Sequence, residues 1–222
     1  MERTNWYLLE KEDISTKLGT DLEKGLSSEI ASERLKTYGY NELISKEGPT
    51  IWQMLLEQFK DFLVLILIGA SLVSALIGEV TDSVVIILIV ILNATLGVIQ
   101  EFKANKALEA LKRMAAPEAK VIRDGKIVEI PARELVPGDL VVLEAGNYVP
   151  ADLRLIESVN LKVEEASLTG ESVPVEKNAE IVFDNEVPLG DRTNSAFMST
   201  VVTYGRGKGI VVETGMNTQI GL

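Results

Sequence analysis

Two long apolar runs stand out in the pattern of hydrophobic and polar positions. Phe62–Gly78 and Ser83–Ile99 are each 17 residues long without a charge, and only Glu79–Asp82 separates them. As helices at about 1.5 Å per residue, each spans roughly 26 Å, slightly less than the ~30 Å hydrocarbon core of a membrane. We expect extension backwards through Phe59 and forwards into Gln100. Core helices of a soluble protein are the competing interpretation, but so short a connection favours a two-helix transmembrane hairpin.

Basic residues flank these runs and are missing from the connection between them. The nearest ones are Lys46, Lys60, Lys103, Lys106, Lys112 and Arg113. Because Lys and Arg accumulate on the cytoplasmic side of a membrane, both ends of the hairpin should be cytoplasmic. We therefore expect an integral, multi-pass membrane protein.

Helix-forming residues continue past the second run, from Glu101 to Met114. Strong helix formers dominate this stretch, and Glu109 and Arg113 are four residues apart, so we predict one unbroken helix that leaves the bilayer and ends before Pro117. Such a rod can transmit the rotation of a cytoplasmic domain into the membrane. A plain charged linker helix is the alternative.

The first 50 residues are polar and mixed in charge. A short helix is predicted over Ser27–Lys36, with a hydroxyl cap at its start and Gly39 at its end. Its main apolar residues are Ile30 and Leu35. On the pattern alone, this region is a small surface helical hairpin.

From Glu118 onward the pattern changes to short strands between turns. Ala119–Arg123 and Lys126–Ile130 are predicted to form a hairpin across Asp124-Gly125. Further strands are expected at Leu140–Leu143, Leu153–Ile156, Ala196–Val202 and Gly209–Glu213. Many short strands favour an all-β sandwich, jelly roll or distorted barrel.

The segment Gly205–Gly209 is basic and rich in glycine. It lacks the spacing of a phosphate-binding P-loop, and no capped helix follows it. We interpret it as a turn between strands, with Arg206 and Lys208 in solvent.

These elements predict an α+β membrane protein fragment in three segments. Residues 1–50 form a cytoplasmic helical segment, 51–116 the transmembrane hairpin with its helical cytoplasmic extension, and 117–222 a β-rich cytoplasmic domain. The high apolar content of 46% beside 25% charged residues fits such a division into an apolar and a charged part.

Composition excludes several chemistries. The chain has neither cysteine nor histidine, so thiolate or imidazole metal sites and Ser-His-Asp hydrolysis are excluded. A net charge of −11 without a basic stripe argues against nucleic-acid binding. Nor does the start of the chain have the apolar region of a cleavable signal peptide.

The polar loop Leu168–Ser172 is the best candidate for chemistry. Gly170 allows a sharp turn or a close approach to another surface, and Glu171 at the tip lies between the hydroxyls of Thr169 and Ser172. A carboxylate placed in this way can orient and deprotonate a water molecule if an electrophile comes from elsewhere. A hairpin turn with solvated polar residues is the alternative.

The order of motifs in the whole chain resembles the P-type ATPases that pump cations, in particular their calcium-pump-like branch. The residues that carry the resemblance are Val136–Asp139, Val149–Asp152, Leu168–Ser172 and the run from Asn194 through Thr214–Thr218 to Gly221. Two departures are Glu165-Ala166-Ser167 before the loop and Ser199-Thr200 where a Gly-Thr pair is usual. The resemblance covers nearly all 222 residues but only the front part of a pump.

The resemblance implies an actuator domain with its first two transmembrane helices. In that family Glu171 would activate the water that attacks an aspartyl phosphate, Thr169 and Gly170 would place donors near the phosphoryl oxygens, and Ser172 would hold the shape of the loop. The phosphorylation motif and the nucleotide-binding domain are missing from these residues, so the fragment alone should be inactive. ATP and Mg²⁺ would act in the complete pump, and no cofactor or metal is expected on this chain.

The implied partners are the other domains and transmembrane helices of the same pump, the lipid bilayer and the transported cation. Calcium is the expected ion because the stretch Glu57–Asp61 and the run from Ile91 to Glu101 look like those of calcium pumps. Asp82 matches an acidic position there and would gate ions, or serve as a helix cap. Sodium, potassium and proton pumps remain possible, as does a different class: a membrane-tethered β-domain that binds a partner without catalysis.

Overall fold

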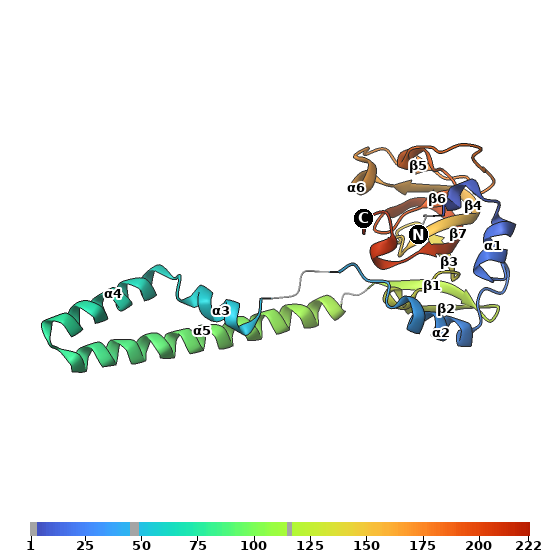
Figure 1. The fold of residues 1–222 in the computed structure, drawn as a ribbon. Helices are drawn as coiled ribbons and strands as arrows, with labels where there is room; N and C mark the ends of the chain where they lie inside the picture. Colours follow the sequence, from blue (N-terminus) through green and yellow to red (C-terminus); the bar gives the residue numbers. More distant parts are fainter. Residues whose placement is uncertain (1–3, 45–48, 115–116) are drawn as a thin grey trace. The chain divides into compact units, whose positions relative to one another are not determined.

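The computed structural model of the chain describes residues 4–44, 49–114 and 117–222. These residues form two compact units, one of residues 4–44 with 117–222 and one of residues 49–114. The N-terminal segment, which we expected as a segment of its own, therefore shares a unit with the β-rich region (Figure 1).

In the part of the chain that the structure describes, seven antiparallel strands of the first unit form one sheet in the order β2-β1-β3-β7-β4-β5, with β6 beside β4. The strands are β1 (Glu118–Arg123), β2 (Lys126–Pro131), β3 (Leu140–Glu144), β4 (Asp152–Glu164), β5 (Val175–Glu176), β6 (Ser195–Ala196) and β7 (Val201–Glu213). The helices of the unit are η1 (Trp6–Leu8), α1 (Lys11–Leu18), α2 (Ser28–Tyr38), η2 (Ala132–Glu134), α6 (Ala166–Thr169), η3 (Leu189–Asp191) and η4 (Gly215–Asn217). The expected combination of helices with an antiparallel sheet is confirmed.

The hairpin across Asp124-Gly125 is also confirmed. Arg123 pairs with Lys126, so the loop has two residues, and both have positive φ angles of 52° and 71°. This is the I′ type of turn, whose twist matches that of the two strands.

The expected turn at Gly205–Gly209 is wrong, because this segment lies inside the long strand β7. A Cβ on Gly205 would come closer than 3.0 Å to the carbonyl oxygen of Asn160, and one on Gly207 would lie 2.8 Å from the carbonyl oxygen of Glu157. The pairing of β4 with β7 is interrupted by bulges in this region. The glycines therefore let two bulged strands approach closely rather than ending a strand.

A single strand over Ala196–Val202 was predicted, and this is wrong as well. Residues after β6 form a turn, in which Ser199 has a φ of 70°, and β7 begins only at Val201. This left-handed conformation explains why glycine is usual at the position of Ser199 in the family that the sequence resembles.

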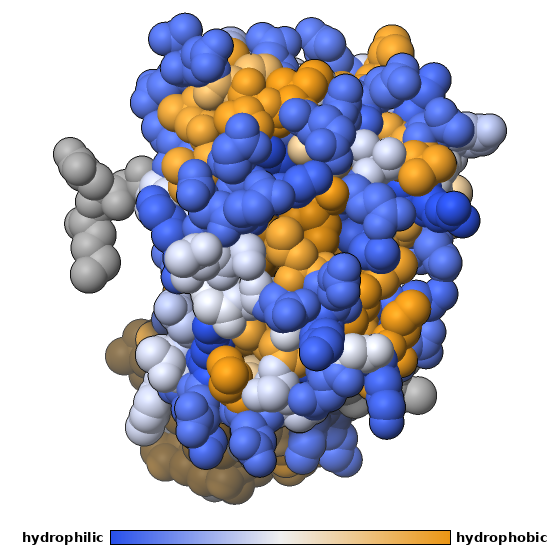
Figure 2. Space-filling view, turned by 90° about the vertical axis from the view of Figure 1, so that its right-hand side faces the viewer, coloured by the Kyte–Doolittle hydropathy of each residue, from blue (hydrophilic) through white to orange (hydrophobic). Residues whose placement is uncertain are grey.

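The two largest apolar clusters in the described part of the first unit pack against its sheet. The larger one lies between the strands and includes Val121, Leu135, Leu143, Leu153, Leu155, Leu161, Val163 and Val211, all buried. The second consists of Ile14 from α1 with Ile122, Leu140, Ile210 and Val212, so α1 covers the other face of β1, β3 and β7. Polar residues predominate on the outer face of this unit, with apolar ones in bands between them (Figure 2).

The helix predicted at Ser27–Lys36 is present as α2. The Ser27 side chain accepts a hydrogen bond from the backbone of Ile30, and Gly39 caps the other end, as expected. Its buried contact is made by Ala31, which packs with Leu26 and Val136, while Ile30 is 42% exposed.

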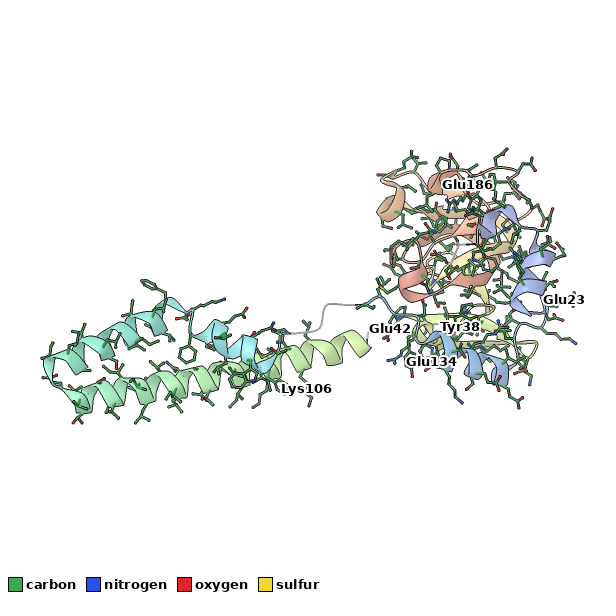
Figure 3. The ribbon with its side chains drawn as sticks, viewed as in Figure 1. Glu23, Tyr38, Glu42, Lys106, Glu134 and Glu186 are labelled. Carbon is green, nitrogen blue, oxygen red and sulfur yellow. The ribbon has the colours of Figure 1, made fainter. Side chains whose placement is uncertain are left out.

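The N-terminal segment is fastened to the loop between β5 and β6. Asn5 donates a hydrogen bond to Glu186 at 2.8 Å, and Asn194 donates one to the carbonyl of Tyr7 at 2.8 Å. Glu186 is labelled in Figure 3. Arg154, buried in β4, donates to the carbonyls of Ala179 and of Leu9. Burial lowers the pKa of Arg154 to about 10. These contacts join chain segments that are far apart in the sequence.

The second unit contains three helices in its described residues: α3 (Ile51–Gln58), α4 (Phe62–Ile77) and α5 (Val80–Met114). The first apolar run does not extend backwards through Phe59 as one continuous helix. The Asp61 side chain caps α4 by accepting a hydrogen bond from the backbone of Leu63, and α3 and α4 meet at a bend of 65°. A capping carboxylate starts a new helix here.

The helix α5 runs without a break from the apolar run into the charged stretch, as predicted, and Lys106 projects from its charged part (Figure 3). Lys46 and the side chains of Glu109, Lys112 and Arg113 lie outside the described residues. Among the residues described, α5 is the only helix long and apolar enough by itself to cross a membrane, and the bent pair α3–α4 adds a second crossing if it counts as one span.

The helices α4 and α5 pack against each other along one face. The hydroxyls of Ser71 and Ser83 are 2.8 Å apart and buried, and Val64, Val90 and Ala94 are buried as well. Most other apolar side chains of both helices are exposed, including Leu76 at 87%. Such an apolar exterior is typical of helices that lie in lipid.

Candidate functional site

The polar loop begins with a helical turn rather than a strand. The strand β4 ends at Glu164, and α6 follows over Ala166–Thr169. The Glu165 carbonyl accepts hydrogen bonds from the backbone N–H groups of Leu168 and Thr169, both at 2.9 Å. The loop is therefore a fixed turn and not a free linker.

Gly170 ends this turn with a φ of 77°. This left-handed conformation is the one that favours glycine at the end of a helix. A Cβ at Gly170 would meet no atom within 4 Å. The space around the glycine is thus open on the surface of this unit, so another molecular surface can approach the backbone there.

Glu171 is exposed directly after Gly170. Its backbone N–H donates to the hydroxyl of Thr169 at 3.3 Å, and this hydroxyl donates to the carbonyl of Glu165 at 3.0 Å. Within the described parts of the chain, no group binds the Glu171 carboxylate. Ser172 is exposed beside it. The structure therefore brings the predicted loop residues Thr169–Ser172 together. The Glu171 carboxylate is exposed to solvent, and the Thr169 hydroxyl is hydrogen-bonded to the backbone.

A buried ion pair lies directly under this loop, and our sequence analysis missed it. Lys177 Nζ is 2.6 Å from Glu165 Oε1, and both side chains are 0% exposed. Burial raises the pKa of Glu165 and lowers the pKa of Lys177, and each partner opposes the shift of the other. A signal was available: Leu161 and Val163 alternate with exposed residues in β4, and the same alternation continues to Glu165, directly after the strand, so it buries the carboxylate as well.

The aspartates of the two upstream motifs stabilise turns. The buried carboxylate of Asp139 accepts hydrogen bonds from Arg123 and from the backbone of Val136. The carboxylate of Asp152 accepts from the backbone N–H groups of Met198 and Gln219, at 2.9 and 2.7 Å. Both motifs therefore shape the domain on which the loop is carried.

The other predicted site residue, Asp82, belongs to the second unit. It lies in the first turn of α5 and is exposed. An acidic residue at this position is favourable beside the positive end of the helix dipole. Within the described residues, no group of three or more acidic side chains is close enough to hold a metal ion.

Comparisons with known proteins place both parts of the chain. The family described as the P-type ATPase actuator domain matches residues 113–222. The family described as the N-terminus of cation transporter ATPases matches residues 6–74. Together these two matches include the loop, the sheet that carries it and most of the helix α4.

Complete proteins give the same result. A calcium-transporting ATPase of Bacillus cereus is 57% identical over 222 residues, which cover 98% of this chain and 25% of the relative. One from Listeria monocytogenes is 49% identical over 90% of this chain and 22% of its own length. A sodium/potassium exporting P-type ATPase of Schizosaccharomyces pombe is 44% identical over 97% of this chain and 21% of its own length.

The chain thus spans about a quarter of the length of the curated relatives it matches. The chain belongs to the P-type ATPases, and its β-rich region is an actuator domain of this family.

Proposed function

We propose that this chain is the front part of an ATP-driven cation pump, in which Glu171 activates the water that hydrolyses an aspartyl phosphate held by another domain. The observation that carries the proposal is the exposed carboxylate of Glu171 on a hydrogen-bonded turn, where none of the described residues binds it. ATP supplies the phosphoryl group and Mg²⁺ neutralises its charge in the complete pump, and the residues of this chain contribute neither.

The proposed step is a simple hydrolysis. Glu171 takes a proton from water while the water oxygen attacks phosphorus, and the bond between phosphorus and the aspartate oxygen breaks. The products are inorganic phosphate and the free aspartate carboxylate. Phosphoryl transfer requires an attacking group in line with the leaving group, so a base on a rigid turn has an advantage over one on a free loop.

The neighbours of Glu171 have supporting roles in this proposal. The open space at Gly170 allows the turn to come close to the phosphoryl oxygens, where the backbone N–H groups act as donors. Thr169 and Ser172 maintain the shape of the turn, and the bonds of the Thr169 hydroxyl within the loop support this role.

The second unit would couple this step to the membrane. We place the bent pair α3–α4 and the helix α5 in the bilayer as a two-helix transmembrane hairpin, with both ends cytoplasmic, and we describe the sheet as a distorted jelly roll. The uninterrupted course of α5 from its apolar into its charged part supports its role as a rod. Rotation of the actuator domain would move this rod and thereby the membrane helices.

Calcium is the cation that we propose. The relatives from Bacillus cereus and Listeria monocytogenes are named calcium-transporting ATPases, although the one from Schizosaccharomyces pombe is named as a sodium and potassium exporter. We assign Asp82 to the ion pathway because it is an exposed acid at the start of an apolar helix. No observation favours the alternative of a tethered domain without catalysis.

The test uses a complete pump in which this chain replaces the corresponding segment of the Bacillus cereus relative. Glu171→Gln keeps the size of the side chain but removes the base, so the phosphorylated enzyme should form normally and decay about 10²–10⁴-fold more slowly. Glu176→Gln, an exposed neighbour on β5, is the control and should decay at the normal rate. Rapid decay of the Glu171→Gln enzyme would exclude the proposed role. The 222-residue chain alone should not hydrolyse ATP.

A further inference from the structure

The pair of Glu165 and Lys177 is unusual because both charges are completely buried. Their nitrogen and oxygen are 2.6 Å apart, and Lys177 Nζ is also 5.5 Å from the centre of the Phe197 ring. The contact is a close ion pair without hydrogen-bond geometry, and within the described residues neither charged group has another hydrogen-bond partner. Each charge therefore depends on the other one.

The two residues enclose the polar loop. Glu165 follows the end of β4, and its carbonyl accepts the hydrogen bonds of Leu168 and Thr169 that create the turn before Gly170. Lys177 follows the end of β5 on the other side of the loop. The side chains thus join the residue that begins the loop to the residue that follows it.

Little else closes the loop at this point. The ladder between β4 and β5 consists of two residue pairs, Lys162 with Glu176 and Val163 with Val175. One further backbone hydrogen bond joins Lys177 to the carbonyl of Leu161 at 2.8 Å. So short a ladder is weak by itself, and the ion pair adds a side-chain connection across the base of the loop.

A buried ion pair is a poor choice for stability alone. The free-energy cost of removing two charges from water is often larger than the gain from their attraction. Well-packed apolar side chains would fill the same space without that cost. The pair does, however, constrain the position of the backbone, because a buried carboxylate and a buried ammonium group must meet at a defined distance and place. Apolar contacts tolerate a shift of the backbone more easily.

We propose that Glu165 and Lys177 form a positioning pair, which holds the turn in the orientation that brings the Glu171 carboxylate to the phosphorylated aspartate. This inference rests on the proposed function of Glu171. The pair touches neither water nor phosphate. It acts through the backbone of Glu165, on which the turn is built.

The test measures the decay of the phosphorylated enzyme in the complete chimaeric pump, in a single turnover. Glu165→Gln and Lys177→Gln each leave one buried charge without its partner, and we expect decay to slow about 10–100-fold because small misplacements of a reacting group have effects of this size. In the double variant two neutral amides can bond to each other, and a large part of the rate should return. The exposed pair Lys208–Glu157, changed to Gln in both positions, is the matched control and should decay normally.

The rate constant separates positioning from stability. If the pair only stabilised the fold, the single variants would yield less phosphorylated enzyme, and that enzyme would decay at the normal rate; this outcome overturns the inference. Glu171→Gln is measured in parallel. Normal decay of Glu171→Gln rejects the proposed function, whereas slow decay there with normal decay in both single variants rejects the positioning pair alone.

A second measurement covers variants that fail to assemble as a pump. In the 222-residue chain, hydrogen exchange at the amides of Thr169 and Gly170 should be faster in Glu165→Gln than in the parent chain, since both amides donate to the turn. Changing the control pair, Glu157 on β4 and Lys208 on β7, to Gln should leave the exchange rates of these amides unchanged. Unchanged exchange in Glu165→Gln would overturn the inference independently of activity.

Discussion

Arg123 binds Asp139 with two hydrogen bonds, from Nε to Oδ1 at 2.8 Å and from Nη2 to Oδ2 at 2.7 Å. The Asp139 side chain is completely buried, and its Oδ2 also accepts the backbone N–H of Val136 at 3.0 Å. This pair joins the end of β1 to the turn before β3. A motif that identifies the family in the sequence therefore has a structural purpose in this domain.

Removing the carboxylate from this pair should destabilise the first unit strongly. Asp139→Ala leaves Arg123 without its partner, and we expect the free energy of unfolding to fall by roughly 3–5 kcal/mol. Denaturant unfolding of the 222-residue chain in detergent, followed by the fluorescence of Trp6 in a Trp52→Phe background, measures this change. Glu157→Gln, which breaks the exposed pair with Lys208, should change it by less than about 1 kcal/mol. Equal effects of the two changes would contradict the assignment.

Gly205 should tolerate no side chain. It has a φ of 76°, and a Cβ there would collide with the carbonyl of Asn160. Left-handed strain and overpacking together predict a loss of roughly 2–5 kcal/mol for Gly205→Ala. Gly146 has a φ of 93° but an open surrounding, so Gly146→Ala should show only the strain of about 1–2 kcal/mol. The same unfolding experiment compares them, and an equal loss would show that the close approach of β4 and β7 is unimportant.

Asp124 should make the attachment of α2 sensitive to acid. Hydrogen bonds from the Ser28 side chain and backbone lower the pKa of Asp124 below its ordinary 3.8. A lowered pKa in the folded state gives stability that is present above the unfolded value and is lost as the pH falls through the folded value. The parent chain should thus be more stable than Asp124→Asn at pH 7, and this difference should shrink below about pH 4. Asparagine tolerates the φ of 52°, so the turn itself is kept.

Unfolding midpoints of both chains, measured across this pH range, check the prediction. The comparison between the two chains matters because other carboxylates titrate in the same range and cancel in the difference. A difference that stays constant down to pH 2 would mean that the Asp124 charge contributes nothing.

The helix α5 should lose its mechanical role if its charged part becomes flexible. A run of glycines inserted beside Ala107 should break the rod without touching either the loop or the apolar part, because glycine is a poor helix former. In the chimaeric pump we expect ATP hydrolysis to continue while calcium transport into vesicles falls. An equally long run of alanines keeps the helix and should preserve more transport. If the glycine variant transports as much calcium per ATP hydrolysed as the parent pump, the proposed role of α5 as a rod is refuted.

Features that depend on neighbouring residues followed from the sequence. The turn at Asp124-Gly125 was predictable because two adjacent residues with positive φ suffice to form it. The cap of α2 at Ser27 and the continuous helix α5 likewise depend on residues within a few positions of each other. The exposed position of Glu171 on a sharp turn belongs to the same group, since Gly170 alone allows that turn.

What the sequence by itself determined is thus the set of local elements, the motifs of the family and the candidate loop. Only the tertiary structure decided that the glycines of β7 face the bulged strand β4, that the N-terminal segment is fastened near Arg154, and that Glu165 meets Lys177 under the loop. The physical reason is that these contacts join residues whose partners are chosen by packing and by the need of every buried charge for a counter-charge. Spacing along the chain does not record which distant groups will meet.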